Sequence, residues 1–570
     1  MTELSFKGKE FVYNHHLAVP FRPLVPDAKK GIGPVALDGN LIIQGDNLHA
    51  LKALLPFYAG KVDCIFIDPP YNTGNEGWSY NDNVNAPMIR EWLEANPIGI
   101  EDGLRHDKWC AMMWPRLCLL RDLLADDGVI FICIDDNELY RLRTMLDEIF
   151  YRAENWIGTI VWKNVTDNNP TRIAVEHEYI ICFSRDKDKV GKIWKSTISD
   201  IKDALIGVGK DLAAKYPDDR ELEHEYAKWF RAHKSELWPL DRYKYIDRGG
   251  VFTGSQSVHN PGKEGYRYDV IHPVTKKPCK QPLMGYRFPK ETMDDLLAAG
   301  KILFGDDETK IIELKLYAHE YQEKLPSVIE LDGRTSAYEL RSIFPEKKKT
   351  FDHAKPSALV EQILSFATKK DGVVLDSFAG SGTTAHAVLK LNAADGGTRQ
   401  FVIVEGEDYA DELTAERVRR VMSGVAGAED ELAKGLGGTF TYCVLGEPVE
   451  LDQVLTGRTL PSFVGIGAEL FRMATNRALV PAAVREEDFY LGEADGQHVW
   501  LIYRPDLEWL KTADSALTLS RAKAFAAADS KRRHLVFAPA RYVSQKMLDE
   551  QNIPVEFVPL PFALYRIDRS

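Results

Sequence analysis

The chain has 570 residues, enough for roughly two to four domains, and it is 45% hydrophobic and 28% charged, as expected of a globular rather than a disordered protein. A formal net charge of -13 at pH 7 excludes a surface that is basic throughout, so any nucleic-acid binding would need a local concentration of positive charge. Seven cysteines without a C-x-x-C pair predict reduced thiols in a cytosolic protein, and we expect neither a signal peptide nor a membrane-spanning helix.

The first predicted elements are an arm and a strand. Residues 1–40 are rich in proline and predict an irregular arm packed on the core. The apolar run 41–44 predicts a strand, and an amphipathic helix follows through Leu55. Asp46 and Asn47 lie between them, at the carboxyl end of the strand, where capping of the helix is the simplest role for either side chain.

The next strand, predicted over 62–67, ends at Asp68-Pro69-Pro70-Tyr71. Two prolines cannot continue a central ladder, so the acid and the ring lie at the carboxyl end of the strand, where α/β sheets bind ligands. Asp68 and the Pro69 carbonyl can accept hydrogen bonds from an amino group, and Tyr71 offers a face to a flat ring. The pattern is therefore suited to hold the exocyclic amine of a planar base. By itself, so short a motif is also compatible with a plain turn whose acid caps the next element.

Downstream, the pattern predicts a helix over about 105–124 with an apolar stripe that belongs to the core, and a buried strand over 128–134. Asp135 and Glu138 fit a capping box for a helix over 137–150 better than they fit a metal site. The segments 159–163 and 179–183 predict two further strands that suit a hairpin, with His177 and Glu178 in the polar segment between them.

Residues 191–345 lose strong periodicity, which predicts a domain inserted between two halves of the core, 41–190 and 346–425. Between residues 263 and 290, seven cations stand against two acids, leaving five net positive charges interleaved with aromatic rings. In an acidic protein this cluster is typical of a surface that binds phosphates, although a solvated loop explains any single lysine equally well. The predicted DNA-binding cations are Lys263, Arg267, Lys276, Lys277, Lys280, Arg287 and Lys290.

The second half of the core contains a strand, a glycine-rich turn and a helix. Gly380 and Gly382 let a ligand approach the backbone closely, yet no lysine stands where a phosphate-binding loop needs one. The next strand, 400–405, ends at Glu405, roughly twenty residues on, the position that hydrogen-bonds a ribose in dinucleotide-binding folds. We therefore predict a nucleoside-containing cofactor without phosphates. Lys355 precedes a proline at the start of a predicted helix, where its ammonium and the helix amides can meet a carboxylate.

Residues 426–570 follow a series of glycines that predicts a boundary. Their alternating patterns predict a small α/β module whose chemistry the sequence does not identify.

Together, Asp68–Tyr71 and Phe378–Gly382 resemble the base-handling and cofactor motifs of amino-group DNA methyltransferases that use S-adenosylmethionine. Their order along the chain is similar to that of the permuted beta class. The runs 68–83 and 105–109 resemble modification subunits of Type III restriction–modification systems. The resemblance implies an α/β fold with a Rossmann-like methyltransferase sheet, the insert as a target-recognition domain, and the C-terminal module as a dimerisation or partner-docking element.

The function that the resemblance implies is methyl transfer from S-adenosylmethionine to N6 of an adenine flipped out of duplex DNA. Aspartate at the head of the first motif favours adenine N6, with cytosine N4 as the alternative. A non-catalytic recognition subunit and an RNA or protein-glutamine methyltransferase also remain open. The implied setting is cytoplasmic and nucleoid-associated, with a homodimer and a helicase–endonuclease partner.

The resemblance also implies roles for single residues. The implied catalytic residues are Asp68, Pro69, Pro70 and Tyr71. His177 would lie beside the target-base pocket, although a structural histidine is at least as well supported. The implied cofactor-binding residues are Asp46, Asn47, Lys355, Asp376, Phe378, Ala379, Gly380, Gly382, Thr383 and Glu405. No metal ligands are implied.

Overall fold

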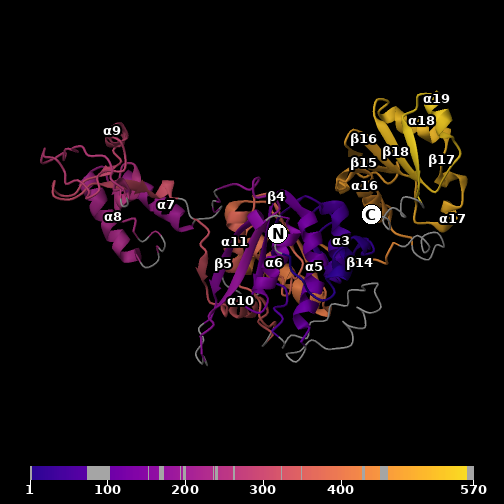
Figure 1. Ribbon diagram of the computed structural model, residues 1–570, viewed down its shortest axis with the longest axis horizontal. Helices are drawn as coiled ribbons and strands as arrows, with labels where there is room; N and C mark the ends of the chain where they lie inside the picture. Colours follow the sequence, from indigo (N-terminus) through magenta and orange to yellow (C-terminus); the bar gives the residue numbers. More distant parts are fainter. Residues whose placement is uncertain are drawn as a thin grey trace. The chain divides into compact units, whose positions relative to one another are not determined.

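The computed structural model describes residues 3–73, 103–151, 153–165, 172–192, 200–234, 242–260, 263–321, 324–347, 350–425, 431–449 and 460–560, with Trp194, Ser196, Leu237 and Leu240. Residues 74–83, the end of the run 68–83, lie outside the described residues. The chain divides into two compact units (Figure 1), one made of Met1–Trp194 with Leu325–Ser570 and the other of Lys195–Lys324. The second unit falls within the segment that the sequence predicts as an insert.

A mixed sheet forms the centre of the first unit (Figure 1), and ten strands of the described chain take part in it. Neighbouring strands from β14 to β4 run parallel, whereas the pairs β1–β14, β4–β6 and β6–β5 are antiparallel. The predicted α/β fold with a Rossmann-like sheet is confirmed. In spatial order the strands are β1 (Leu24–Pro26), β14 (Thr441–Leu445), β2 (Leu41–Gln44), β13 (Gln400–Glu405), β12 (Val373–Asp376), β3 (Val62–Ile67), β4 (Leu124–Ile134), β6 (His177–Ser184), β5 (Trp156–Lys163) and β11 (Val328–Glu330).

The central strands owe their continuous apolar sequences to burial on both faces. In β13 every residue after Gln400 is buried, and in β3 only Asp63 is not. Parallel strands covered by helices on both faces read as unbroken runs of Val, Ile and Leu, which is why the sequence predicts β13 with its observed bounds.

Two groups of helices pack around the sheet. In one group α3 (Asn47–Tyr58) packs on α5 (Arg105–Leu123), and α5 packs on α6 (Leu139–Ile149). In the other, α11 (Ser357–Ala367) packs on α12 (Thr383–Asp395), and α12 packs on α13 (Glu416–Ser423). The predicted helix over 105–124 is α5, and its apolar stripe is buried in the main core, including Trp109, Met113 and Leu117.

The predicted capping box at the start of α6 is wrong. The helix begins after Glu138, and no side chain caps it. Asp135 Oδ1 accepts from the Asn137 amide at 2.9 Å instead, which shapes the turn before the helix. The carboxylate of Glu138 is fully buried and turns toward the residues that follow β3.

The core sheet includes strands that lie before residue 41 and after residue 425, outside the predicted core segments. β1 lies inside the predicted arm 1–40 and pairs with β14. β14 pairs with β2, so the sheet continues past residue 425, where the sequence predicts a boundary. Gly435, Gly437 and Gly438 lie in the loop before β14, where the Leu436 amide donates to the Val421 carbonyl at 2.8 Å. β14 satisfies backbone groups that would otherwise be unpaired along the outer edge of β2.

The C-terminal residues form an α/β module within the first unit. α16 (Phe463–Thr475) begins at Ser462, whose hydroxyl accepts from the Gly465 amide at 3.1 Å. The module's sheet has the order β15 (Tyr490–Ala494), β16 (Gln497–Leu501), β18 (Arg533–Ala538), β20 (Val555–Pro559), with α18 (Leu519–Ala528) and α19 (Gln545–Glu550) in the crossovers. In the described parts of both units, no helix combines the length and the apolar character needed to cross a bilayer.

The described residues of the second unit form a small sheet of their own and two separate hydrophobic clusters. The sheet has the order β7 (Tyr245–Asp247), β8 (Gly250–Ser255), β10 (Glu313–Tyr317), β9 (Ile302–Leu303). One cluster includes Tyr226 and Tyr243, and the other includes Val270 and Tyr286. Its helices are α7 (Asp200–Lys215), α8 (Asp219–His233) and α9 (Lys290–Ala298).

Candidate active site

Strands β3 and β12 lie side by side, although they come from distant parts of the sequence. Val374 pairs with Cys64 and Leu375 with Ile65 in parallel register, so both strands end at the same edge. From β12 the chain crosses to β13 on one side, and from β3 it crosses to β4 on the other. Such an edge is a topological switch point, where open α/β sheets bind ligands. The Asp68–Tyr71 turn and the glycine turn 378–382 therefore meet in one site.

Buried polar contacts hold the turn after β3. Trp109 Nε1 donates to the Pro70 carbonyl at 2.7 Å. Asn72 is fully buried in the left-handed backbone region, with a φ of 61°, and its Nδ2 donates to Glu138 Oε1 at 2.5 Å. His106 Nδ1 lies 2.5 Å from the same oxygen. Burial raises the pKa of Glu138, and the hydrogen bonds from Asn72 and His106 oppose that rise. Glu138 is thus an anchor of the turn that the local sequence pattern misassigns.

Four side chains, which we call the Asp68 cluster, meet at this edge: Asp68, Tyr71, Glu178 and Lys355. Asp68 Oδ1 accepts from the Tyr71 hydroxyl at 2.9 Å, and Asp68 Oδ2 accepts from Lys355 Nζ at 2.7 Å. Glu178 Oε2 lies 2.9 Å from the Tyr71 hydroxyl and 3.5 Å from Lys355 Nζ. Asn164 Nδ2 donates to the other oxygen of Glu178 at 2.6 Å.

Burial and the neighbouring carboxylates determine the protonation states of Lys355 and Tyr71 in the Asp68 cluster. Burial alone would lower the pKa of Lys355, but the carboxylates of Asp68 and Glu178 raise it above its ordinary value, so the ammonium stays charged. Burial, followed by the charge of Asp68, raises the pKa of Tyr71 well above its ordinary value, so the phenol stays neutral. The ammonium also lies 5.0 Å from the centre of the Tyr71 ring. The structure therefore directs Lys355 to two carboxylates, and its contact with a cofactor carboxylate stays a prediction.

The glycine turn requires its glycines. Gly380 and Gly382 have φ values of 52° and 80°, in the left-handed region that residues with a side chain rarely adopt. A Cβ on Gly382 would also meet the Thr414 carbonyl oxygen at 3.0 Å. The Gly380 amide donates to Glu405 Oε2 at 2.7 Å, and the Ala379 amide to the Val404 carbonyl at 3.0 Å. Glu405 at the end of β13 thus helps to fix the turn.

The residues around this turn are buried and polar. Asp376 accepts from the Phe378 amide at 2.9 Å and from the Thr384 hydroxyl at 2.6 Å. Thr383 Oγ1 donates to the Lys355 carbonyl at 3.2 Å, which links the start of α12 to the residue that pairs with Asp68. Ser377 Oγ is buried and has no hydrogen-bond partner among the described residues. A polar ligand at the turn would satisfy that hydroxyl.

Asp376 is expected to make stability depend on pH. Burial raises the pKa of its carboxyl from 3.8 to about 7, so the folded chain keeps a proton that the unfolded chain has released. The free energy of unfolding therefore falls as pH rises through this window, by about 1.4 kcal/mol per unit. Asp376→Asn should lack this pH dependence. Between pH 4 and pH 7, the free energy of unfolding of the variant should therefore rise relative to that of the native chain by several kcal/mol in order of magnitude. Urea unfolding at both pH values measures the difference, and a difference that is independent of pH would contradict the assignment.

Asp46 and Asn47 fix the start of α3 next to the glycine turn. Asp46 caps α3 by accepting from the Leu48 and His49 amides at 3.0 and 3.2 Å. Asn47 is buried, and its Nδ2 donates to the Ser377 carbonyl at 2.9 Å while its Oδ1 accepts from Arg116 Nε at 2.6 Å. These bonds tie the start of α3 to the glycine turn. The predicted contact of either residue with a cofactor stays a prediction.

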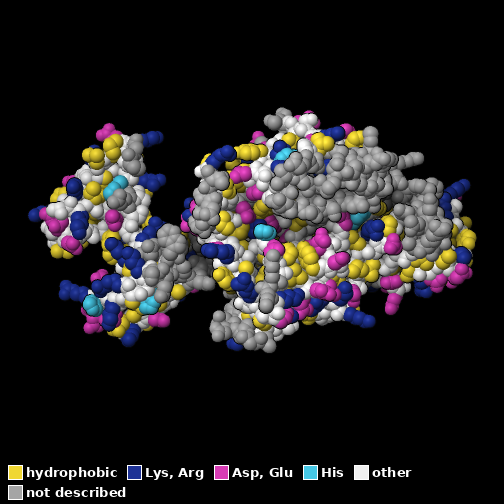
Figure 2. Space-filling model, turned by 90° about the horizontal axis from the view of Figure 1, so that it is seen from below, with side chains coloured by type: hydrophobic (Ala, Val, Ile, Leu, Met, Phe, Trp, Pro, Cys, Tyr) yellow, Lys and Arg dark blue, Asp and Glu magenta, His cyan; other side chains and the backbone are white. Residues whose placement is uncertain are grey.

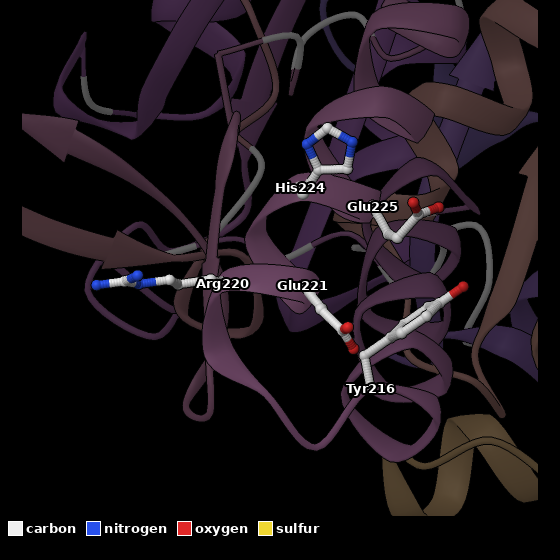
Figure 3. Close-up of a pocket in the computed structure, with 5 residues that line it drawn as sticks. All are labelled: Tyr216, Arg220, Glu221, His224 and Glu225. Atoms are coloured by element: carbon white, nitrogen blue, oxygen red, sulfur yellow. The ribbon is translucent and has the colours of Figure 1, made fainter.

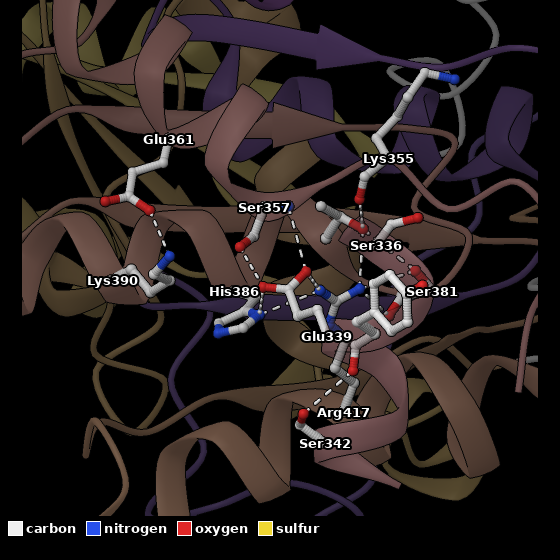
Figure 4. Close-up of polar contacts among 12 residues, drawn as sticks. Ser336, Glu339, Ser342, Lys355, Ser357, Glu361, Ser381, His386, Lys390 and Arg417 are labelled. Atoms are coloured by element: carbon white, nitrogen blue, oxygen red, sulfur yellow. Dashed lines mark hydrogen bonds and ion pairs between the residues drawn. The ribbon is translucent and has the colours of Figure 1, made fainter. Parts of the chain in front are cut away.

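A buried network around Arg417 lies against the glycine turn (Figure 4). The guanidinium donates to Glu339 Oε2 at 3.0 Å and to the Ser381 and Thr383 hydroxyls at 2.9 Å each. Burial, followed by the charge of Arg417, lowers the pKa of His386 to about 3, so its neutral ring can accept from Arg417 at 3.1 Å. The network joins α10 (Thr335–Ile343), α12 and α13 to the turn.

Removal of Arg417, which is fully buried, is expected to leave the partly buried Glu339 carboxylate without its guanidinium partner. Arg417→Met should lower the free energy of unfolding by about 3–5 kcal/mol, the usual cost of breaking a buried ion pair on one side. Arg420→Met is the matched control on the same helix, because Arg420 is partly exposed and pairs with Glu416 and Glu346 at the surface, where about 1 kcal/mol or less is expected. Chemical unfolding measures both, and equal losses would contradict the role of the network.

The structure exposes the predicted DNA-binding cations of the second unit. All seven, from Lys263 to Lys290, have exposed side chains. Two of them are paired, Lys277 with Glu308 at 3.1 Å and Lys290 with Asp294 at 3.2 Å. The aromatic residues between them are partly structural, because Tyr286 is fully buried and stacks on Tyr268. Figure 2 shows Lys, Arg, Asp and Glu side chains interspersed over the visible face, so positive charge does not dominate it.

His177 has a structural partner in the first unit. At the start of β6, its Nε2 lies 2.9 Å from the Tyr179 hydroxyl, and the two rings meet edge to face at 4.9 Å. This contact fits the structural alternative, and a contact of His177 with DNA stays a prediction. Within the described ranges, no group of three or more His, Cys, Asp or Glu side chains is placed to hold a metal ion.

A surface pocket of about 390 Å³ lies on the second unit (Figure 3), whereas the Asp68 cluster belongs to the first. Tyr216 after α7 and the first turns of α8 line it, with Arg220, Glu221, His224 and Glu225. Ligand pockets are mostly apolar with a few convergent polar groups, but this lining is largely charged and the Arg220 side chain points away from the others. We assign no function to it.

A comparison with known proteins finds a matching family model and several relatives of this chain. A family model described as DNA methylase matches residues 62–416. The Type III restriction-modification enzyme EcoP15I Mod subunit of Escherichia coli is 53% identical over 379 residues, which cover 64% of this chain and 58% of the relative. The StyLTI Mod subunit of Salmonella typhimurium is 30% identical, over 76% of this chain and 65% of the relative. The EcoPI Mod subunit of Escherichia phage P1 is also 30% identical, over 74% of this chain and 68% of the relative.

The alignments thus span only 58% and 65% of the first two relatives. The family match nevertheless covers more than half of this chain and contains both turns that meet at the switch point, Asp68–Tyr71 and 378–382. The resemblance to amino-group DNA methyltransferases, and to Type III modification subunits in particular, is confirmed by these matches. The chain belongs to the DNA methylase family.

Proposed function

We propose that the protein is a site-specific DNA methyltransferase that transfers a methyl group from S-adenosylmethionine to N6 of adenine in duplex DNA. The observation that supports the proposal is the parallel pairing of β3 with β12, because it brings a turn whose residues suit an amino group beside a glycine turn that suits a nucleoside. The similarity to Mod subunits favours adenine over the cytosine N4 alternative.

The chain's own residues suit the chemistry of an aromatic amine. Adenine N6 is a weak nucleophile because its lone pair is delocalised into the ring. The Asp68 carboxylate and the Pro69 carbonyl can accept the two amino hydrogens, which favours a tetrahedral nitrogen whose lone pair is free to react. Such positioning and charge stabilisation lower barriers by several kcal/mol in order of magnitude. Because the amine cannot be reached inside a duplex, the base must flip out, and the Tyr71 ring offers it a stacking face.

S-adenosylmethionine supplies, when bound, a methyl group on a sulfonium. The glycine turn fits such a ligand, because Gly380 and Gly382 keep side chains away from the backbone and Ser377 Oγ is buried without a partner among the described residues. We assign direct binding to the turn 376–383 and to Glu405. We assign an indirect role to Asp46 and Asn47, whose side chains hold α3 and the Ser377 carbonyl in place.

The relatives also guide the proposal about partners, since each is a Mod subunit of a Type III restriction-modification enzyme. For this chain we propose duplex DNA, bound through the exposed cations of the second unit, as the substrate. We further propose a homodimer and a helicase–endonuclease partner, with action on DNA in the cytoplasm.

The test is to sequence DNA from cells with and without the protein for methylated bases, and to offer the purified protein labelled S-adenosylmethionine with duplex DNA, RNA or peptide. Methylated adenine within one short sequence is the expected result. Methylation at cytosine N4 would support the alternative, and transfer only to RNA or peptide would contradict a DNA substrate. DNA binding without any transfer would identify a non-catalytic recognition subunit.

A further inference from the structure

Glu178 is a member of the Asp68 cluster that neither sequence motif contains. It is the second residue of β6, and its side chain is 23% exposed. One of its oxygens faces Tyr71 and Lys355, the same two donors that bind Asp68. The other oxygen is held by Asn164, so the carboxylate has a fixed orientation.

The Tyr71 hydroxyl has fewer hydrogens than acceptors within reach. The Tyr71 hydroxyl has one hydrogen but lies 2.9 Å from an oxygen of Asp68 and 2.9 Å from an oxygen of Glu178. Lys355 has three hydrogens and lies within 2.7 Å of Asp68 and 3.5 Å of Glu178. Both donors can therefore turn to Glu178 when a target amine engages Asp68. Without Glu178, they would be left buried with an incomplete set of acceptors, which is costly.

The cluster also carries a net charge. Two carboxylates, Asp68 and Glu178, face one ammonium, Lys355, which leaves one negative charge. The proposed reaction starts from a cationic methyl donor and places positive charge on the amine during transfer. A fixed negative charge at this edge stabilises both the bound cationic donor and the positive charge that develops on the amine.

We propose that Glu178 is a positioning residue for methyl transfer, which holds Tyr71 and Lys355 while Asp68 binds the amine and gives the cluster its net negative charge. This role rests on the proposed function. It applies to a residue that contacts the catalytic turn from a strand two positions away in the sheet.

The first test measures binding without DNA. Calorimetry with S-adenosylmethionine and with S-adenosylhomocysteine, which lacks the sulfonium charge, gives a ratio of affinities. Glu178→Gln should lower the preference for the cationic ligand about 3–10-fold, because one charge is lost nearby, and Glu178→Asp should restore most of it. Glu330→Gln is the control, because Glu330 is exposed on β11 and should leave the ratio unchanged. An unchanged ratio of the two affinities in Glu178→Gln, or an equal loss of affinity for both ligands, would overturn the electrostatic role of Glu178.

The second test measures single-turnover methylation at saturating DNA and cofactor. Glu178→Gln should lower the rate about 10–100-fold with little change in the KM for DNA, and Asn164→Ala should lower it less. The two changes together should be no worse than Glu178→Gln alone, because Asn164 acts through Glu178. Additive losses, or full-rate transfer by Glu178→Gln, would overturn the role of Glu178. Absence of transfer by the native chain would instead contradict the proposed function. If Glu178→Gln fails to fold, Glu178→Ala, which also removes the charge, takes its place in the first test, and Asn164→Ala, with its smaller expected loss of rate, carries the second.

Discussion

Asp68→Ala is expected to abolish methyl transfer, with a loss of about 1,000-fold, while duplex DNA is still bound. The variant removes the proposed acceptor for the target amine and the 2.7 Å partner of Lys355. Binding should survive because the proposed phosphate contacts come from exposed cations of the second unit. Transfer of labelled methyl groups measures the first effect, and fluorescence anisotropy with duplex DNA measures the second.

The matched control for this variant is Asp371→Ala. Asp371 is an exposed acid in the turn before β12, so its removal changes the net charge equally without touching the Asp68 cluster. Its methyl-transfer rate should equal that of the native chain. Transfer by Asp68→Ala at a rate close to that of Asp371→Ala would defeat the catalytic assignment, and a parallel loss of DNA affinity would show that Asp68 acts on binding.

Gly380→Asp is expected to remove cofactor binding, with a loss of affinity of about 100-fold or more. Gly380 has a φ of 52°, and a Cβ there would meet the Phe351 ring at 3.3 Å. The new carboxylate would also stand beside Glu405, whose oxygen accepts from the Gly380 amide at 2.7 Å. Strained backbone and like charges both oppose the conformation of the turn that we propose binds the cofactor. Calorimetry with S-adenosylmethionine measures the loss.

Gly396→Asp is the control that separates the effect of backbone strain from the effect of a change in the glycine turn itself. Gly396 ends α12 with a φ of 67°, but a Cβ there would meet no atom within 4 Å. The two variants therefore carry similar backbone strain, and only one of them alters the glycine turn. Cofactor affinity should be unchanged in Gly396→Asp. A comparable loss in both variants would mean that general destabilisation, rather than the turn, explains the effect of Gly380→Asp.

The central strands and α5 follow from the sequence because their signals are local. β13 and β3 are buried on both faces and therefore appear as continuous apolar runs. β1 and β14 are missed because they are short and lie in segments dominated by proline and glycine. Their pairing depends on a partner strand elsewhere in the chain, and no local pattern records it.

The same distinction holds for the site. Asp68 and the glycines at 380 and 382 are predicted because proline, positive φ and the end of a strand restrict the residue types within one turn. Glu138 resembles a helix cap but anchors Asn72, and Arg417, which neither motif contains, is fully buried and donates to Ser381 of the glycine turn. Both side chains owe their roles to residues that are distant in the sequence.

The sequence by itself determined the chemistry of the two turns. One has an acid and an aromatic ring on which a base can stack, and the other is a glycine turn without the lysine of a phosphate-binding loop. Only the tertiary structure decided that β12 lies beside β3 and that Glu178 and Lys355 close around Asp68. The physical reason is that turn chemistry depends on neighbours along the chain. The choice of neighbouring strands, and the pairing of buried charges, depends on how the whole sheet packs.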